Sequence, residues 1–76
     1  MQTNFVWKSF ANGPSEIYHS TIDPITHTIC SIWESPKQII LGINGYRFSG
    51  YPNLDKAKLD AEDRLKNNRG IYLKES

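Results

Sequence analysis

Apolar and polar residues alternate with a period of two along the first two thirds of the chain, as is typical of strands. Clusters of Asn, Gly, Pro, Asp and Ser interrupt the alternation and predict turns. Between these turns lie five strand-like segments, which span residues 4–11, 16–22, 28–34, 38–43 and 46–49. The third segment carries apolar residues on both faces, so we expect it to lie at the centre of a sheet.

The dipeptide Asn44-Gly45 separates the last two strand-like segments. A tight two-residue hairpin turn needs positive φ at both central positions, and Asn and Gly tolerate this best. The sequence therefore predicts a hairpin whose tip is Asn44-Gly45.

The period changes to that of a helix near residue 54, and we expect a helix over residues 54–68. Asn53 is a suitable N-cap, and Gly70 is suited to the position after the last turn. Residues 71–73 are apolar and add a short edge strand or pack against the domain. The expected apolar stripe of the helix consists of Leu54, Ala57, Ala61 and Leu65.

A run of strands followed by one helix predicts an α+β fold. We expect a single domain over residues 1–76, in which an antiparallel meander of four to five short strands packs one face on the C-terminal amphipathic helix. To the helix side we assign Tyr18, Ile22, Cys30, Ile32 and Leu41. We expect the opposite side to hold some of Trp33, Ile29, Ile17, Phe48 and Tyr46.

The composition limits the cellular compartment and the cysteine chemistry that we expect. The chain has one cysteine, so no intrachain disulfide forms, and we expect Cys30 to be a buried structural thiol in a reducing cytoplasm. No secretion signal and no apolar run of about 20 residues is visible, so we expect no membrane partner.

The titratable residues do not converge in the sequence as those of an active site do. His19 and His27 are ordinary histidines in this interpretation, because no third metal ligand accompanies them. The acidic cluster of Asp60, Glu62 and Asp63 is interpreted as a solvated helix face. We therefore expect no enzyme activity, no metal and no cofactor.

Aromatic residues make up 12% of this small chain. They either pack among themselves or form an interaction surface, since a contiguous apolar patch on a small domain marks a binding site. Leu59 lies off the helix stripe and contacts either the C-terminal tail or a partner. The candidate binding residues are Trp33, Tyr46, Arg47, Phe48, Tyr51 and Leu59.

The chain resembles small phage- and prophage-encoded sheet-plus-helix proteins. The resemblance lies in three aromatic positions of the strand region, in the hairpin and in the run Gly50 to Glu62. In that run, Ala57-Lys58 and Ala61-Glu62 match the Ala-Lys-x-x-Ala-Glu pattern with which the helix of such proteins begins. The resemblance implies an accessory protein that works in the host cytoplasm. It implies stoichiometric binding to a host protein, such as a defence or regulatory component.

The order of elements also resembles AP2-type and integrase arm-binding domains, which read DNA with the sheet. The chain departs from them because its strand region carries few cations: Lys8, Lys37 and Arg47. In this alternative, Arg47 lies between the stacking surfaces of Tyr46 and Phe48. We also expect a homo-oligomer, and a small-ligand site at a subunit interface stays open.

Overall fold

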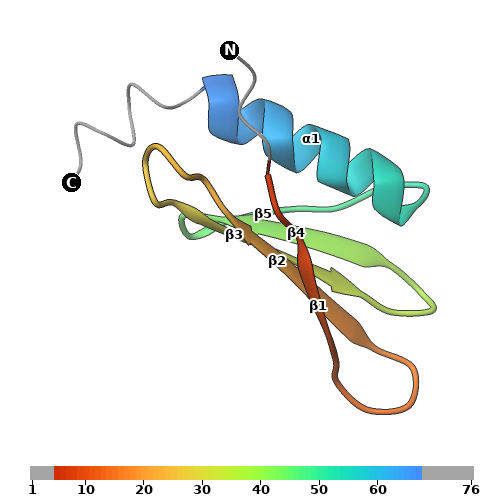
Figure 1. Cartoon of the computed structure of the whole chain (residues 1–76). Coiled ribbons are helices and arrows are strands. Elements are labelled where there is room, and N and C mark those ends of the chain that lie inside the picture. Colours follow the sequence, from red (N-terminus) through yellow and green to blue (C-terminus); the bar gives the residue numbers. More distant parts are fainter. Residues whose placement is uncertain (1–4, 68–76) are drawn as a thin grey trace.

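The computed structural model describes residues 5–67, which form a five-stranded sheet and one helix (Figure 1). The sheet order is β1-β2-β3-β4-β5, and every neighbouring pair is antiparallel. This meander with a following helix confirms the α+β prediction, with β3 at the centre. The elements are β1 (Lys8–Ala11), β2 (Ile17–Ile22), β3 (Ile29–Glu34), β4 (Ile39–Ile43), β5 (Tyr46–Phe48) and α1 (Leu54–Asn67).

The predicted hairpin tip is confirmed. Asn44 and Gly45 have φ of 49° and 86°, and the flanking residues Ile43 and Tyr46 are paired. At the first turn, the Asn12 N–H donates to the Glu16 carbonyl at 2.8 Å. These closures fix the register of each hairpin and therefore which side chains share a face.

The core lies between α1 and one face of the sheet, as Figure 1 shows. Its sheet side consists of buried residues of β3 and β4, and the helix contributes Ala57, Ala61 and Leu65. The small alanines let the helix approach the sheet closely. The Asn53 side chain accepts the Lys56 N–H at 2.9 Å, which confirms the N-cap.

Cys30 is fully buried in this core. Burial, together with the nearby charge of Asp60, raises the pKa of its thiol to about 12. The thiolate that reactive cysteines need is therefore not formed near neutral pH, and Cys30 is structural as predicted.

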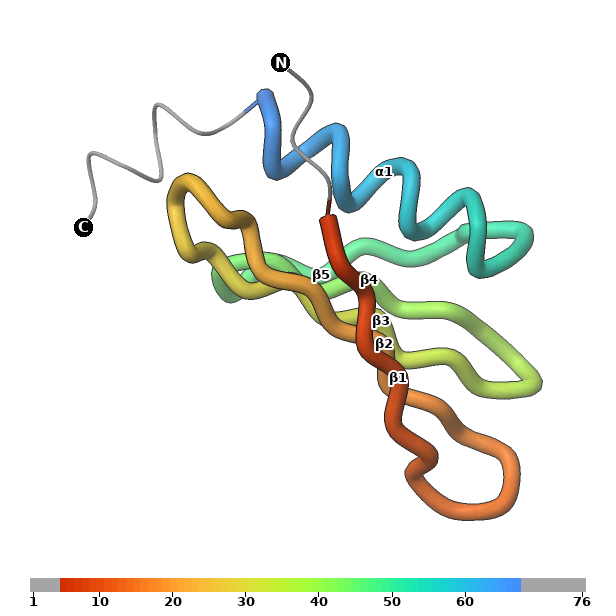
Figure 2. The backbone as a smooth tube through the Cα atoms, viewed as in Figure 1, coloured from red at the N-terminus to blue at the C-terminus, as the bar shows by residue number. Residues whose placement is uncertain are grey.

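The first strand is shorter than the sequence pattern predicts. Residues 5–7 continue the chain upstream of β1 and rise towards α1 (Figure 2). The Trp7 indole N–H donates to the Glu62 carboxylate at 2.8 Å, and the Lys58 ammonium lies 5.5 Å from the Trp7 ring centroid. These contacts with the helix explain why the segment leaves the ladder, and they also correct the interpretation of Glu62 as merely solvated.

The predicted distribution of side chains between the two faces is wrong at several positions. Tyr18 and Ile22 lie on the face away from α1, whereas His19 and Thr21 are 5% and 4% exposed on the helix side. The reason is that the buried side of β2 is polar and hydrogen-bonded, so its apolar side faces outward. The remaining errors concern residues that alternate onto the helix side, namely Ile17, Tyr46 and Phe48.

Position 68 of the predicted helix, Gly70 and residues 71–73 lie outside the described residues. Within residues 5–67, no helix has the length and apolar character needed to cross a membrane.

Candidate binding face

The sheet surface opposite α1, here called the open face, is covered by no described element (Figure 1). Strand register arranges its side chains in three rows that cross the strands. The aromatic row consists of Phe10, Tyr18, Trp33 and Ile40. The donor row consists of Lys8, Ser20, Ser31, Gly42 and Arg47. The isoleucine row consists of Ile22 and Ile29.

The aromatic row is solvent-accessible although its members are large. Phe10 is 57% and Tyr18 is 41% exposed, and the Tyr18 and Trp33 rings stack with centroids 6.5 Å apart and planes inclined by 22°. Aromatic residues at this separation gain from their mutual contact. The row therefore presents a preformed apolar ridge across four neighbouring strands.

The donor row runs beside this ridge from one edge of the sheet to the other. Lys8 lies on β1 and Arg47 on β5, and the hydroxyls of Ser20 and Ser31 lie between them. At about 4.8 Å per strand, four strand spacings separate the two cations by roughly 19 Å. None of these four side chains has a hydrogen-bond or ion-pair partner among residues 5–67.

Two shallow hollows lie along the donor row. One, of about 390 Å³, is lined by Ser31, Gly42 and Arg47 together with the aromatic residues Tyr18 and Trp33 and with Ile40. The other, of about 270 Å³, is lined by Val6, Lys8, Ser20, Thr21, Ile22 and Ile29. Gly42 lines the first hollow without a side chain. A Cβ there would meet only the Ser31 and Tyr46 carbonyl oxygens, at 3.9 Å.

Charge is distributed unequally between the two sides of the domain. The five strands contain one acidic residue, Glu34, which lies on the helix side. The open face of these strands therefore carries Lys8 and Arg47 and no carboxylate. Helix α1, in contrast, balances four acids, Asp55, Asp60, Glu62 and Asp63, against four cations, Lys56, Lys58, Arg64 and Lys66.

Of the six residues predicted to bind a partner, the structure brings two together on the open face. Trp33 and Arg47 line the same hollow. Tyr46 is 68% exposed beside the hairpin tip, and Leu59 is 61% exposed on α1. Phe48 lies beneath Arg64, whose guanidinium carbon is 3.7 Å from the ring centroid, and the Tyr51 hydroxyl donates to Asp60.

Arg47 does not lie between the stacking surfaces of Tyr46 and Phe48, because neighbouring residues of a strand point to opposite faces. Sequence reasoning also missed the rest of the open face, above all Phe10 and Lys8. The position of the turn centre could have revealed them, because it determines which residues of the two flanking strands are paired. Residues equidistant from Pro14 face each other, which pairs Phe10 with Tyr18 and Lys8 with Ser20.

Tyr51 and Asp60 belong to a small network between the β5–α1 loop and the helix. Asp60 accepts hydrogen bonds from the Tyr51 hydroxyl and, at 2.8 Å, from Arg64 Nε. Burial alone would raise the pKa of Asp60, but the hydrogen bonds from Arg64 and Tyr51 and the charge of Arg64 lower it below 3.8. Burial, followed by the bond to Asp60, raises the pKa of Tyr51 to about 12. The network therefore fastens the helix to the β5–α1 loop.

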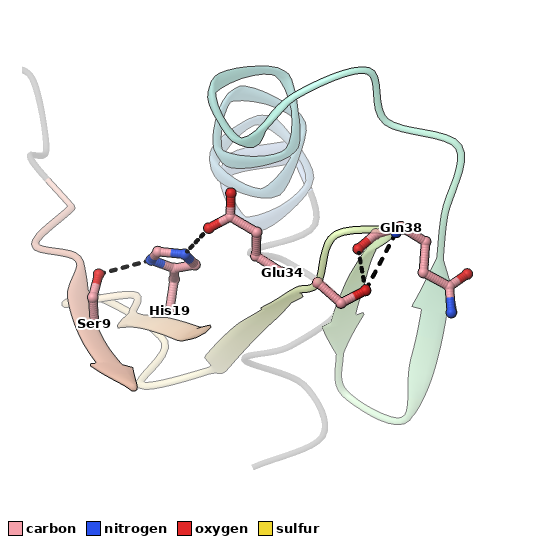
Figure 3. Close-up of polar contacts among 5 residues, drawn as sticks. Ser9, His19, Glu34 and Gln38 are labelled. Carbon is pink, nitrogen blue, oxygen red and sulfur yellow. Dashed lines mark hydrogen bonds and ion pairs between the residues drawn. The ribbon is translucent and has the colours of Figure 1, made fainter. Parts of the chain in front are cut away.

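A serine, a histidine and a glutamate meet on the helix side of β1, β2 and β3 (Figure 3). Ser9 Oγ lies 2.7 Å from His19 Nδ1, and His19 Nε2 lies 2.9 Å from Glu34 Oε1. The order hydroxyl, imidazole, carboxylate is that of a nucleophile, a base and an orienting acid. Sequence reasoning missed this cluster, although Ser9 and His19 are also equidistant from Pro14.

The cluster also has a structural role. His19 is 5% exposed, and a buried imidazole needs a partner for each ring nitrogen. Ser9 and Glu34 supply those partners and connect three strands. The hollows of the open face lie on the other side of the sheet, whereas a third hollow, of about 330 Å³, is lined by Glu34 together with residues 35–39 and 51–54. Among residues 5–67, no three His, Cys, Asp or Glu side chains are grouped closely enough to hold a metal ion.

Comparison with protein-family models, with curated proteins and with solved structures finds no match to the chain.

Proposed function

We propose that the protein acts by stoichiometric binding to another protein through the open face. The observation that carries the proposal is the uncovered apolar surface of the sheet, where Phe10, Ile22 and Ile29 are 57%, 49% and 62% exposed. Apolar area of this kind on a small domain is costly to leave in water and marks an interaction site.

The composition of the face supports a protein partner. Trp, Tyr and Arg contribute most to the affinity of protein interfaces, and Trp33, Tyr18 and Arg47 lie together in one hollow. The resemblance to phage-encoded accessory proteins makes a host protein, in the host cytoplasm, the first partner to seek. The face contributes a contact area and, in this proposal, no catalytic step.

The partner is a different protein rather than a second copy at this face. Stacking two open faces would bring Lys8 and Arg47 of both copies into one interface that has no carboxylate on either strand surface. Like charges juxtaposed in an interface oppose association. Homo-oligomerisation stays a prediction and would use another surface, such as the edge strand β1 or β5.

The proposal is tested by affinity capture from host lysate with two matched variants. The double variant Phe10→Ser/Ile29→Ser changes exposed positions of the open face, and Leu59→Ser changes a residue of similar exposure on the helix. We expect the parent and Leu59→Ser to retain one partner at a 1:1 ratio and the double variant to lose it. Circular dichroism verifies that all three are folded. Retention by the double variant and loss by Leu59→Ser would place the interface on the helix instead.

Single-stranded nucleic acid is a second candidate, favoured by the coincidence of an aromatic row with two cations and no acid on one sheet face. Bases stack on exposed aromatic rings, and cations contact phosphates. With two phosphate contacts, the logarithm of affinity should fall by about 1.4 per tenfold rise in salt. An electrophoretic shift of a 12-nucleotide oligo-dT or oligo-rU with this salt dependence would support the candidate. Absence of a shift at low salt would remove it.

A further inference from the structure

The donor row of the open face indicates more closely what the partner presents, if the proposed function holds. We propose that the row binds an extended acidic segment of the partner protein, which crosses the strands with one carboxylate at Lys8 and another at Arg47. This inference rests on the open face being the protein-binding surface and specifies its ligand.

The first support is the hydrogen-bonding chemistry of the row. Lys8, Ser20, Ser31 and Arg47 offer hydrogen-bond donors, and no described residue occupies any of them. Three cations of the helix are engaged, Arg64 with Asp60, Lys58 with the Trp7 ring and Lys66 with the Phe5 ring. A line of unoccupied donors fits a ligand rich in acceptors, and an extended peptide with carboxylates and carbonyl oxygens is such a ligand.

The second support is the spacing. The two cations lie at opposite edges of the sheet, roughly 19 Å apart across four strand spacings. An extended peptide rises about 3.3 Å per residue, so this span corresponds to about six residues. Two carboxylates five to seven positions apart would therefore reach Lys8 and Arg47 together.

The third support is the shape of the surface on either side of the row. The hollows lie between the aromatic row and the isoleucine row, and Gly42 lines the first of them without a side chain. Alternate side chains of an extended peptide point in opposite directions. One set would contact Tyr18 and Trp33, and the other would contact Ile22 and Ile29. Isoleucines suit apolar side chains and offer no stacking surface for bases, which favours a peptide.

The experiment selects binders from a displayed library of random 12-residue peptides, with the full chain immobilised. We expect enriched peptides to carry two acidic residues five to seven positions apart with apolar residues between them. Enrichment of basic peptides, of acidic peptides without this spacing, or of no peptide at all would overturn the inference.

Three variants locate the binding of a selected peptide, measured by fluorescence anisotropy. Lys8→Gln and Arg47→Gln each remove one charge-assisted contact, and we expect each to weaken binding about tenfold or more. Gly42→Leu fills the hollow, and we expect it to abolish binding while the fold is kept, because a Cβ at this position meets no atom closer than 3.9 Å. Lys56→Gln on the helix is the matched control and should bind like the parent. Unchanged affinity in Lys8→Gln and Arg47→Gln would contradict the inference.

The same variants separate this inference from the proposed function. If the captured partner is lost by Phe10→Ser/Ile29→Ser but retained by Lys8→Gln/Arg47→Gln, the open face binds protein. The inference that the donor row binds an acidic segment is then wrong. If the partner is retained by both double variants, the proposed function itself fails. Displacement of a selected peptide by oligo-dT would instead assign the donor row to nucleic acid.

Discussion

The two faces of strand β3 differ more than their composition suggests. On the helix side, Cys30 and Ile32 are completely buried, whereas on the open face Ile29 is 62% exposed and Trp33 lines a hollow. Both faces are apolar, yet only one is covered by a described element. The difference shows that apolar character on both sides of a strand does not imply burial on both sides, because a single helix covers only one of them.

Strand β2 shows the opposite relation. Its covered side carries His19 and Thr21, and its open side carries Tyr18 and Ile22. The covered side is stabilised by the hydrogen bonds of His19 with Ser9 and Glu34, and by the one that the Thr21 hydroxyl donates to the Val6 carbonyl, rather than by apolar burial alone. In this domain the side that the helix covers is therefore not the more apolar side of every strand.

The largest expected effect tests the contrast within β3. Ile32→Ala removes a fully buried side chain and should lower the free energy of unfolding by about 2–5 kcal/mol. Ile29→Ala on the open face should change it by less than about 0.5 kcal/mol. Urea titration followed by circular dichroism measures both. Equal losses would mean that the open face is covered in solution, for example by a second copy.

The hairpin between β4 and β5 offers a matched pair of glycines. Gly45 has φ of 86°, so Gly45→Val should cost about 1–2 kcal/mol from the left-handed backbone alone. At Gly42 a Cβ would make only ordinary contacts, with two carbonyl oxygens at 3.9 Å, so Gly42→Ala should leave stability unchanged or raise it. Thermal unfolding of the two variants makes the comparison. If Gly45→Val melts with the parent, the turn does not set the register of the open face.

The hydrogen-bonded side of β2 is tested at Ser9. Ser9→Ala leaves His19 Nδ1 without its serine partner and should cost about 0.5–1.5 kcal/mol of stability. Hydrolysis of p-nitrophenyl acetate should be the same for the parent and the variant, because we expect the cluster to be structural. A serine-dependent rate above background would instead identify Ser9 as a nucleophile and contradict the expectation that the protein is not an enzyme.

The smallest effect concerns the network that fastens the helix. The pKa of Asp60 lies below 3.8 in the folded state, so its carboxylate favours folding above that pH, and this contribution is lost as the pH falls through the folded pKa. Asp60→Asn should remove this part of the acid dependence, at a cost near neutral pH of less than about 1 kcal/mol.

The pKa of Tyr51 is raised from 10.0 to about 12, so its contribution to the free energy of unfolding is lost as the pH rises through that interval. Melting temperatures measured between pH 2 and 12 test both the acid and the alkaline dependence. Tyr51→Phe is the control for the alkaline dependence, because it lacks the titrating hydroxyl.

Much of the fold could be predicted because its signals are local. Alternation gave the strands, Asn44-Gly45 gave the hairpin and Asn53 gave the helix start, since each depends on a few neighbouring residues. The candidate site was harder to predict than the fold, because it depends on which face of the sheet the helix covers. Trp33 and Arg47 were found, but Phe48 and Tyr51 were assigned to binding although contacts with Arg64 and Asp60 hold them against the helix. Those contacts join residues across the β5–α1 connection and leave no periodic trace in the sequence.

The meander has a consequence for the order in which the domain assembles. Each strand pairs only with its neighbours in the chain, so every hairpin can form from local contacts, which favours rapid folding. The hydrogen bond from Trp7 to Glu62 joins residues 55 positions apart. This bond, and the contact of the Lys66 ammonium with the Phe5 ring, can form only when helix and sheet are together. Loss of these contacts and of the one between Lys58 and Trp7 would detach residues 5–7 from the helix without unpairing any strand. Amide exchange should therefore report earlier opening of the helix and this segment than of β3, whose backbone is paired on both sides.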